Sequence, residues 1–389
     1  MDFTSVQQHM RQSGIDAWVM YDFRGSNFVF STFVPGIVHT TRRLLFVVPA
    51  RGEAFFIAHH IDAPALSKTP IEKKWYLRWQ DLRTTLSAAL SGLSRVAMEY
   101  SPGCMLPVVS IADAGTVELV RSMGVEVVSS ADLIQTGAAV WPAASVARHA
   151  EASRHTSEIM RDAFGLIRHR LASGVRVTEH EGAEYIREQF RARGLEYPDG
   201  PIVASNAHSG DPHFEPTPGN SVEIRRGDWV LIDLWARMPG NENIHSDITW
   251  VGCAGEPSAE QRSVFTAVKA ARDAALERAQ RAWRQKERVE GWQIDDAAME
   301  QIISRAFGEF IRHRTGHSLS PGAKVHGIGM NIDNLETHDT RQMLPGLGFT
   351  IEPGIYTPTF GVRMEINVYV DPAAGPIVTS CVQDDIEKL

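Results

Sequence analysis

The feature that most restricts how this chain folds is a pair of acids set within apolar, strand-like segments. Asp233 ends the run Trp229–Ile232, and Asp247 opens a second run that continues with Ile248. A turn sequence at residues 239–241 lies between them. If the two runs form a hairpin, the acids lie side by side, and two facing carboxylates repel each other unless a cation sits between them.

The same arrangement recurs near the C-terminus. Glu352 lies in an apolar run over residues 349–354, and Glu365 lies in another over 362–368, with a turn sequence between them. Between the two predicted hairpins lies a cluster of histidines: His313, His317, His326 and His338. Four carboxylates and one imidazole are mostly hard ligands, which suit a pair of Mn²⁺, Co²⁺ or Zn²⁺ ions sharing bridging carboxylates.

Each of these positions also has a simpler interpretation. An aspartate at a strand end usually caps a turn or meets an arginine, and a histidine beside glycines is usually a loop residue. Periodicity alone does not decide between a metal centre and separate structural roles.

The pattern along the chain predicts an α/β (α+β) protein of two domains, with residues 1–145 in the first and 150–389 in the second. In the first, strands alternate with helices, as in an α/β unit. The predicted strands are 17–20, 43–48, 54–58, 94–99 and 125–128, and the predicted helices are 81–91 and 111–123. In the second, we predict helices over 150–173, 178–194, 258–285 and 293–311. Thr178 followed by Glu181 has the spacing of a capping box.

Charge and cysteine content restrict the partners and the compartment. The formal net charge of −8 gives no support for a nucleic-acid partner. The three cysteines are scattered and form no paired motif, which favours a reducing compartment. No apolar run has the length of a membrane span, and the N-terminus lacks a signal-peptide pattern. We therefore expect a cytoplasmic protein without a membrane partner.

The acids and histidines lie in strings that resemble the pita-bread metallopeptidases, a family that includes prolidase, aminopeptidase P and the metal-free relative creatinase. The strings are LIDLWARMPGNENIHSDIT, HRTGHSLSPGAKVHGIG, FTIEPGIY and GVRMEINVYV, in the family's order. The resemblance covers roughly residues 155–389 and implies a pita-bread catalytic domain. Residues 1–145 resemble the N-terminal domain of creatinase, prolidase and aminopeptidase P, a domain that methionine aminopeptidases usually lack.

The resemblance implies a role for each matching position. The implied metal ligands are Asp233, Asp247, His317, Glu352 and Glu365, with Asp247 and Glu365 bridging two ions. Thr249 matches a threonine that supports the ligands. Glu352 is also implied in proton transfer, and His213 and His326 in contacts with substrate and the tetrahedral intermediate. The other positions implied around the substrate are His313, Tyr356 and Arg363.

Several positions depart from the family pattern and bear on specificity. Asp233 and Asp247 are separated by a longer loop than is usual, Trp235 replaces a small residue, and Trp250 stands where a basic residue often occurs. His338 lies near the place where prolidases carry an arginine for the substrate's carboxylate. We therefore regard His338, Arg341 and Arg363 as candidates for that contact.

Three functions are open at this stage. The first is hydrolysis of Xaa-Pro bonds in short proline-containing peptides, by a dipeptidase or by an aminopeptidase. The second is a hydrolase or lyase acting on a small amide, amidine or osmolyte, since the fold does not decide the chemistry. The third is a catalytically silent binding protein. All five residues that the family uses as metal ligands are present, so we favour hydrolysis of Xaa-Pro bonds, with a slight preference for a dipeptidase. The resemblance also implies a homodimer with two divalent ions, Mn²⁺ being the expected metal.

Overall fold

The computed structural model describes residues 3–37 and 40–389. The chain divides into two compact units, Met1–Ala138 and Ala139–Leu389. This division precedes the boundary predicted near residue 145, because helix α7 (Ala143–Ser173) begins seven residues before the predicted start at 150 and belongs to the second unit. Among the described residues, none of the helices combines the length and the apolar character needed to cross a bilayer.

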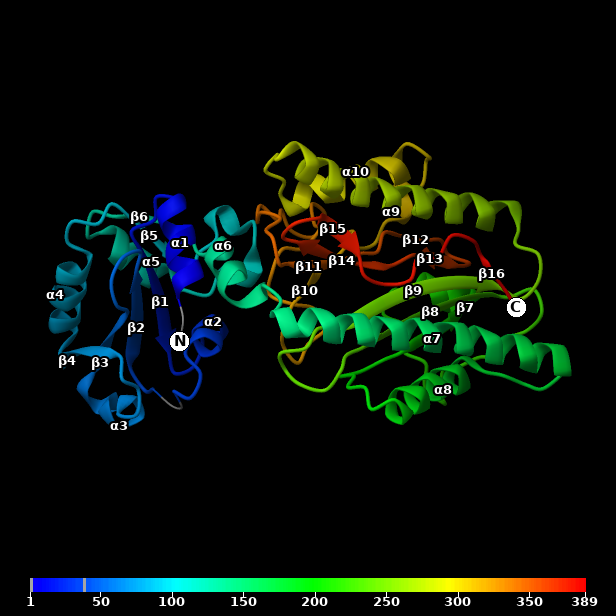
Figure 1. The fold of residues 1–389 in the computed structure, drawn as a ribbon, viewed down its shortest axis with the longest axis horizontal. Helices are drawn as coiled ribbons and strands as arrows, with labels where there is room; N and C mark the ends of the chain where they lie inside the picture. Colours follow the sequence, from blue (N-terminus) through cyan, green and yellow to red (C-terminus); the bar gives the residue numbers. More distant parts are fainter. Residues whose placement is uncertain (1–2, 38–39) are drawn as a thin grey trace. The chain divides into compact units, whose positions relative to one another are not determined.

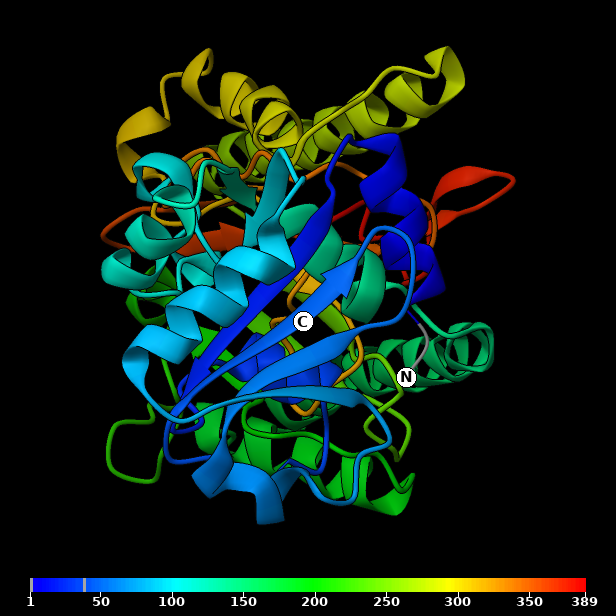
Figure 2. The same cartoon turned by 90° about the vertical axis from the view of Figure 1, so that its left-hand side faces the viewer.

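The first unit is built on one six-stranded sheet, drawn in blue and cyan in Figure 2. The strands, in their order across the sheet, are β4 (Glu72–Tyr76), β3 (Phe55–His59), β2 (Arg43–Pro49), β1 (Ala17–Phe23), β5 (Arg95–Met98) and β6 (Glu126–Ser129). The five predicted strands are confirmed, and β4 was not predicted. Neighbouring strands β1 and β2 are antiparallel, whereas β1 and β5 are parallel.

Both faces of this sheet are covered by helices. Side chains alternate along each strand, so each strand contributes apolar side chains to both faces. Val19 on β1 belongs to a core shared with helices α4 (Trp79–Leu90) and α5 (Ala114–Arg121). Trp18 points the other way and meets Phe33 of α2 (Phe28–Phe33), with ring centroids 4.9 Å apart. The short helices α1 (Thr4–Gln12), α3 (Ala63–Leu66) and α6 (Ala131–Ile134) complete the unit.

The second unit places its strands between two pairs of helices (Figure 1). On one side lie α7 and α8 (Glu179–Ala192), and on the other lie α9 (Ala259–Gln285) and α10 (Gly291–Ile303). Thr178 caps α8 in a capping box with Glu181, as predicted. The first sheet has the order β16 (Glu387–Lys388), β9 (Ser246–Cys253), β8 (Trp229–Ala236) and β7 (Ile202–Ser205).

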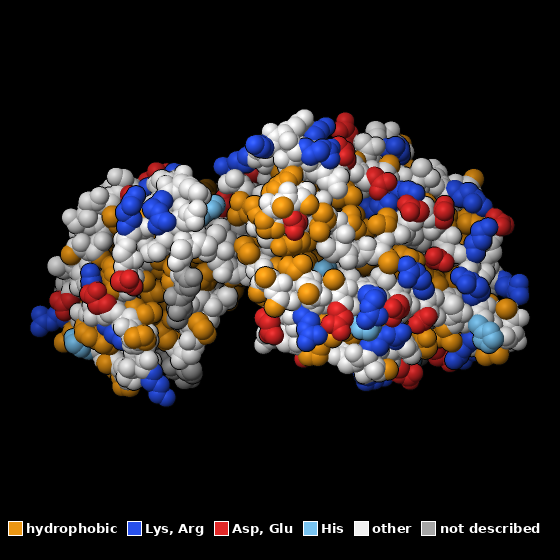
Figure 3. Space-filling view, viewed as in Figure 1, with side chains coloured by type: hydrophobic (Ala, Val, Ile, Leu, Met, Phe, Trp, Pro, Cys, Tyr) orange, Lys and Arg blue, Asp and Glu red, His pale blue; other side chains and the backbone are white. Residues whose placement is uncertain are grey.

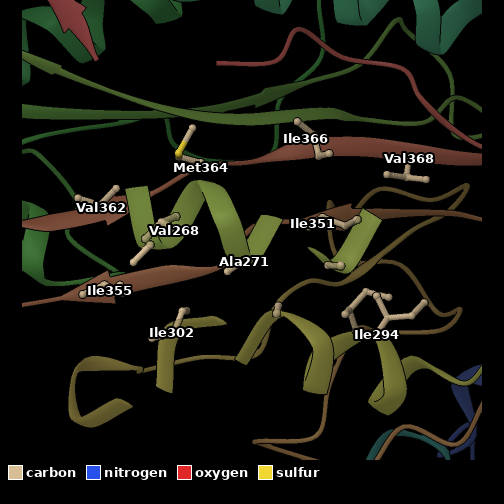
Figure 4. Packing of buried hydrophobic residues seen from close by; sticks show 14 of the residues in the cluster. Val268, Ala271, Ile294, Ile302, Ile351, Ile355, Val362, Met364, Ile366 and Val368 are labelled. Carbon is tan, nitrogen blue, oxygen red and sulfur yellow. The ribbon is translucent and has the colours of Figure 1, made fainter. Parts of the chain in front are cut away.

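The remaining strands of the second unit form a second layer. Its four-stranded sheet has the order β10 (Ser318–Leu319), β11 (Gly348–Ile351), β14 (Ile366–Asp371) and β15 (Gly375–Val378). A two-stranded sheet consists of β12 (Gly354–Tyr356) and β13 (Gly361–Arg363). This layer packs under α9 and α10, and Figure 4 shows Ile351, Met364 and Ile366 against Val268 and Ile294.

Alternation along β8 decides which side chains face the second layer. Ile232 and Leu234 pack with α7 and α8, whereas Leu231 belongs to the core shared with α9. Asp233 and Trp235 continue the face of Leu231, because side chains two residues apart lie on one face of a strand. The predicted metal ligands of the first hairpin therefore lie between the two layers.

The surface of the second unit carries mixed charge. Basic and acidic side chains are interspersed over the face seen in Figure 3. Pairs one turn apart on a helix produce this pattern, for example Arg154 and Glu158 on α7, whose charged atoms lie 3.0 Å apart. Exposed pairs of this kind contribute little to stability.

Candidate metal centre

The first predicted hairpin is confirmed by the register of β8 and β9. Asp233 lies opposite Thr249, and Trp235 lies opposite Asp247. Directly opposed side chains lie on the same face of a sheet, so both acids project from one face. Both are buried, with 7% of Asp233 and 5% of Asp247 exposed.

The second predicted hairpin is also present, as two consecutive strand pairs. Strand β11 pairs with β14 and β12 pairs with β13, all antiparallel. Glu352 follows β11, and Glu365 lies between β13 and β14. The backbone N–H of Glu365 donates to Thr249 O at 3.1 Å, and Thr249 Oγ1 donates to Glu365 Oε2 at 2.9 Å. These two bonds join the second hairpin to the first.

The imidazole of His317 points into the acids. Its Nε2 lies 3.4 Å from Asp247 Oδ2 and 3.4 Å from Glu352 Oε1. Its Nδ1 lies 3.1 Å from Ser318 O, and since a carbonyl only accepts, Nδ1 is the donor. In the neutral ring Nε2 therefore carries the lone pair, as a metal ligand requires.

The histidine is held in place by its backbone. His317 N donates to Thr350 Oγ1 at 2.9 Å, and Thr350 Oγ1 donates to Glu352 Oε1 at 3.0 Å. The preceding Gly316 allows the chain to run close to β11, because a Cβ at this position would lie 2.1 Å from Thr350 O. Glycine at position 316 is thus a steric requirement of the site.

The clustered acids shift one another's pKa values. Burial and the neighbouring carboxylates raise the pKa of Asp247 and of Glu365 well above the ordinary range. Burial also raises the pKa of Asp233, although Arg363 opposes this shift. Burial acts to raise the pKa of Glu352 too, but His317 and the other nearby cationic groups outweigh it and lower that pKa. Asp247 and Glu365 therefore bind protons more readily than isolated carboxyls, because their buried charges are close together.

Two oxygen atoms of this cluster show where positive charge is needed. Asp233 Oδ1 and Glu365 Oε1 are buried without a hydrogen-bond partner in the described part of the chain. One possible metal-ligand atom from each of Asp247, His317 and Glu365 lies within 4.8 Å of the other two. Ionised carboxylates and a neutral imidazole nitrogen offer acceptors only, so this arrangement suits divalent cations.

A chain of buried polar groups extends from the cluster. Arg363 Nη2 forms an ion pair with Asp233 Oδ2, and Arg363 Nη1 donates to Tyr356 OH at 2.9 Å. Tyr356 OH in turn lies 2.6 Å from His313 Nε2. Burial raises the pKa of Tyr356 to about 12, so its hydroxyl stays protonated at neutral pH. The structure thus brings His313, Tyr356 and Arg363 together beside Asp233.

The predicted catalytic histidines differ in how closely they approach the cluster. The ring of His326 lies 4.1 Å from the ring of His317, measured between centroids. His213 is exposed on the loop before the buried Phe214, and its backbone N–H donates to Asp211 Oδ1 at 2.9 Å. A role for His213 in binding substrate stays a prediction.

Two residues predicted to contact the substrate have structural partners elsewhere. Arg341 is buried, and its guanidinium donates to Asp339 and, at 2.9 Å, to Ile328 O. This burial argues against the predicted contact between Arg341 and a substrate carboxylate, because the whole guanidinium is engaged. His338 packs on Trp292 with ring centroids 5.1 Å apart, and its Nδ1 lies 2.7 Å from Asn334 Oδ1.

The sequence did not reveal two residues that hold the cluster together, Asn367 and Thr350. Asn367 binds the backbone of Asp247 through both ends of its amide, and Thr350 links His317 to Glu352. A signal for Asn367 existed, because it follows Glu365 by two residues and alternation places both on one strand face. Thr350 precedes Glu352 by two residues in the same predicted strand, so the sequence carried the same signal for it.

Comparison with known proteins identifies the family. Residues 147–372, more than half of the chain, match the model of metallopeptidase family M24. The chain belongs to metallopeptidase family M24. This membership implies divalent metal ions, and it confirms the predicted family.

The relatives support this assignment. The chain is 31% identical over 209 residues to the probable dipeptidase PepE of Mycobacterium tuberculosis, covering 52% of this chain and 50% of that protein. It is 32% identical over 194 residues to the Xaa-Pro dipeptidase of Pyrococcus furiosus, covering 49% and 51%. The matches thus span about half the length of these curated relatives.

A solved structure extends the likeness to nearly the whole fold. The crystal structure of dipeptidase PepE from Mycobacterium ulcerans superposes with a TM-score of 0.67 and 22% identity, covering 98% of this chain and 95% of that one. The predicted fold, an N-terminal α/β domain followed by a pita-bread domain, is confirmed.

Proposed function

We propose that this protein is a dinuclear metallopeptidase that hydrolyses Xaa-Pro bonds in dipeptides. The observation that carries the proposal is the buried cluster of four carboxylates and one imidazole, with two carboxylate oxygens lacking partners. Buried charge without compensation is costly, so such a cluster is explained by bound cations. The named relatives, a probable dipeptidase and an Xaa-Pro dipeptidase, support the choice of substrate.

The proposed ligands divide between two ions. Asp233 would hold one ion, His317 and Glu352 would hold the other, and Asp247 and Glu365 would contribute to both. Mn²⁺ is the proposed metal, with Zn²⁺ or Co²⁺ as alternatives that fit the same donors. When bound, such a pair lowers the pKa of a water molecule to near neutrality and polarises a carbonyl oxygen.

Glu352 is suited to moving the proton in this reaction. Its side chain is 15% exposed, more than those of Asp233, Asp247 and His317, and its lowered pKa keeps it ionised. It can therefore accept a proton from water and pass it to the leaving nitrogen. As in any amide, the leaving nitrogen must gain a proton as the C–N bond breaks; in an Xaa-Pro bond it is the ring nitrogen of proline.

The remaining polar groups are suited to binding the peptide. His326, next to His317, is proposed to stabilise the oxyanion, and His213 to contact the substrate. Arg363, Tyr356 and His313, which are linked to Asp233, are proposed to line the substrate site. Arg363 is itself engaged by Asp233, Tyr356 and Thr249, so its proposed role is to place positive charge near the substrate. Arg341 is left out of this set because its guanidinium donates to Asp339 and Ile328 O and to none of the predicted ligands.

The test is hydrolysis of Ala-Pro, Ala-Pro-Ala and Ala-Ala by metal-stripped enzyme, with and without added Mn²⁺. We expect cleavage of Ala-Pro alone, and only with metal. Cleavage of the tripeptide after alanine would make the protein an aminopeptidase. If no peptide is cut with metal bound, the peptidase proposal fails and a hydrolase acting on a small amide takes its place.

We also propose that the enzyme is a cytoplasmic homodimer. The described cysteines, Cys104, Cys253 and Cys381, are all free thiols, which fits a reducing compartment. The dimer follows from the family resemblance, and sedimentation velocity at micromolar concentration tests it. A single species at the mass of one 43.1 kDa chain would contradict it.

A further inference from the structure

Trp235 and Asp199 form a pair at the edge of the metal centre that the mechanism above does not use. The indole Nε1 of Trp235 donates to Asp199 Oδ1 at 2.9 Å. Trp235 is only partly buried and Asp199 is exposed, so both reach solvent. In the described part of the chain, no basic side chain forms an ion pair with Asp199.

The sheet places this pair beside the predicted metal ligands. Trp235 is the cross-strand partner of Asp247, and directly opposed side chains lie about 5 Å apart at Cβ. On the other side, Ile202 of β7 pairs with Asp233 of β8, so the antiparallel register carries Gly200 to the level of Trp235.

The position of the indole is defined by its surroundings. A Cβ on Gly200 would lie 2.4 Å from the ring of Trp235, so only glycine allows the ring to rest on this backbone. Gly200 has φ of 72°, a left-handed conformation that also favours glycine. Arg187 Nε fixes the turn by donating to Gly200 O at 2.9 Å. Asp199 and Trp235 are therefore held in place before any ligand binds.

A carboxylate held beside a solvent-accessible indole can bind a cation. The carboxylate supplies charge and hydrogen-bond acceptors, and the indole face attracts ammonium or guanidinium groups. Two basic side chains of this region already have acidic partners: Arg187 pairs with Glu184 at 2.6 Å and Arg237 pairs with Glu196 at 3.0 Å. Arg363 pairs with Asp233.

We infer that Asp199 and Trp235 form a specificity subsite for a positively charged side chain, lysine or arginine, on the residue that precedes proline. This inference rests on the proposed function. The substrate's carboxylate would lie toward Arg363, and its first side chain would extend past Asp247 to Asp199. Both residues are specificity-determining and take no part in the proton transfers.

The test compares Arg-Pro and Lys-Pro with Leu-Pro, which has a neutral side chain. With Mn²⁺-loaded enzyme we expect Asp199→Asn to lower kcat/KM for the two cationic dipeptides by roughly five- to tenfold, through KM, and to leave Leu-Pro nearly unchanged. Trp235→Phe keeps a ring but removes the N–H that orients Asp199, so we expect a smaller loss with the same selectivity. Asp162→Asn, an exposed acid on α7, is the matched control.

Calorimetry with the metal-stripped full chain provides a readout that needs no turnover. Tighter binding of Arg-Pro than of Leu-Pro, lost in Asp199→Asn, supports the subsite even if no peptide is hydrolysed, in which case only the peptidase proposal fails. Hydrolysis with equal losses for Leu-Pro and Arg-Pro in Asp199→Asn overturns the inference, because Asp199 would then bind the α-ammonium group common to both. An unchanged preference in that variant also overturns it.

Discussion

Asn367 holds the backbone of Asp247 with both ends of its side-chain amide. Its Oδ1 accepts from Asp247 N at 3.0 Å, and its Nδ2 donates to Asp247 O. Asp247 is on β9 and Asn367 is on β14, so this contact joins the two layers at the proposed bridging ligand. Asn367 is itself fully buried, so water cannot replace these bonds.

Replacing Asn367 by alanine should destabilise the protein and loosen the metal centre. Two buried backbone groups would lose their partners, at a cost of about 2–4 kcal/mol. Urea denaturation should show a lower midpoint, and metal analysis after dialysis should show a reduced content. Asn334→Ala is the control, because it removes side-chain hydrogen bonds to Asp296 and His338 at an exposed site where water can replace them. An unchanged free energy of unfolding would mean that the hydrogen bonds of the Asn367 side chain make no net contribution to stability.

Thr249→Val tests the hydroxyl that connects the two hairpins. Valine keeps the shape but removes the donor to Glu365 Oε2 and the acceptor for Arg363 Nε at 3.1 Å. Loss of such support typically weakens metal binding about 10- to 100-fold. Competition with a fluorescent chelator measures this affinity. A variant that binds metal as tightly as the wild type would show that Thr249 does not orient Glu365.

Asp247→Asn and Glu365→Gln test the proposed bridging ligands. Each change removes a charge from a buried cluster, so we expect both variants to fold, to bind less metal and to lose activity by at least about a thousandfold. Circular dichroism checks the fold and elemental analysis checks the metal content. Full activity in either variant would rule out the two-metal arrangement.

Arg341→Met separates a structural role from a role in substrate binding. Asp339 would remain buried without its partner, and breaking a buried pair in this way costs about 3–5 kcal/mol. We therefore expect a large loss of stability, with the KM for Ala-Pro unchanged in the protein that stays folded. The double variant with Asp339→Asn should recover much of the stability. A raised KM in that double variant would restore Arg341 to the substrate site.

His149 should make the stability depend on pH in the acid range. It is fully buried, and burial lowers the pKa of its ring to about 4. The unfolded chain, with an ordinary histidine pKa of about 6.5, binds the proton more readily. Stability should therefore be constant above about pH 6.5 and fall as the pH drops toward 4, by about 2–3 kcal/mol from this residue.

Urea denaturation from pH 7.5 to 4.5 measures this effect. His149→Gln should flatten the decline, whereas His169→Gln, at an exposed position of the same helix, should leave it in place. An equal decline in wild type and His149→Gln would show that other groups control the acid range.

The sequence alone predicted the strand-borne acids, both hairpins and most helices of this protein. These features depend on local pattern, because alternation and capping residues are read within a few positions. It missed β4, whose Glu72-Lys73-Lys74 start carries charges suited to an edge strand instead of an apolar pattern.

Only the tertiary structure decided which polar groups become partners. Arg341 and Arg363 were both candidates for the substrate's carboxylate, and the structure pairs the first with Asp339 and the second with Asp233. The contact between Asp199 and Trp235 likewise depends on the register of β7 with β8. The physical reason is that a buried charge is stabilised by groups brought close through sheet pairing and layer packing, over separations that local periodicity does not record.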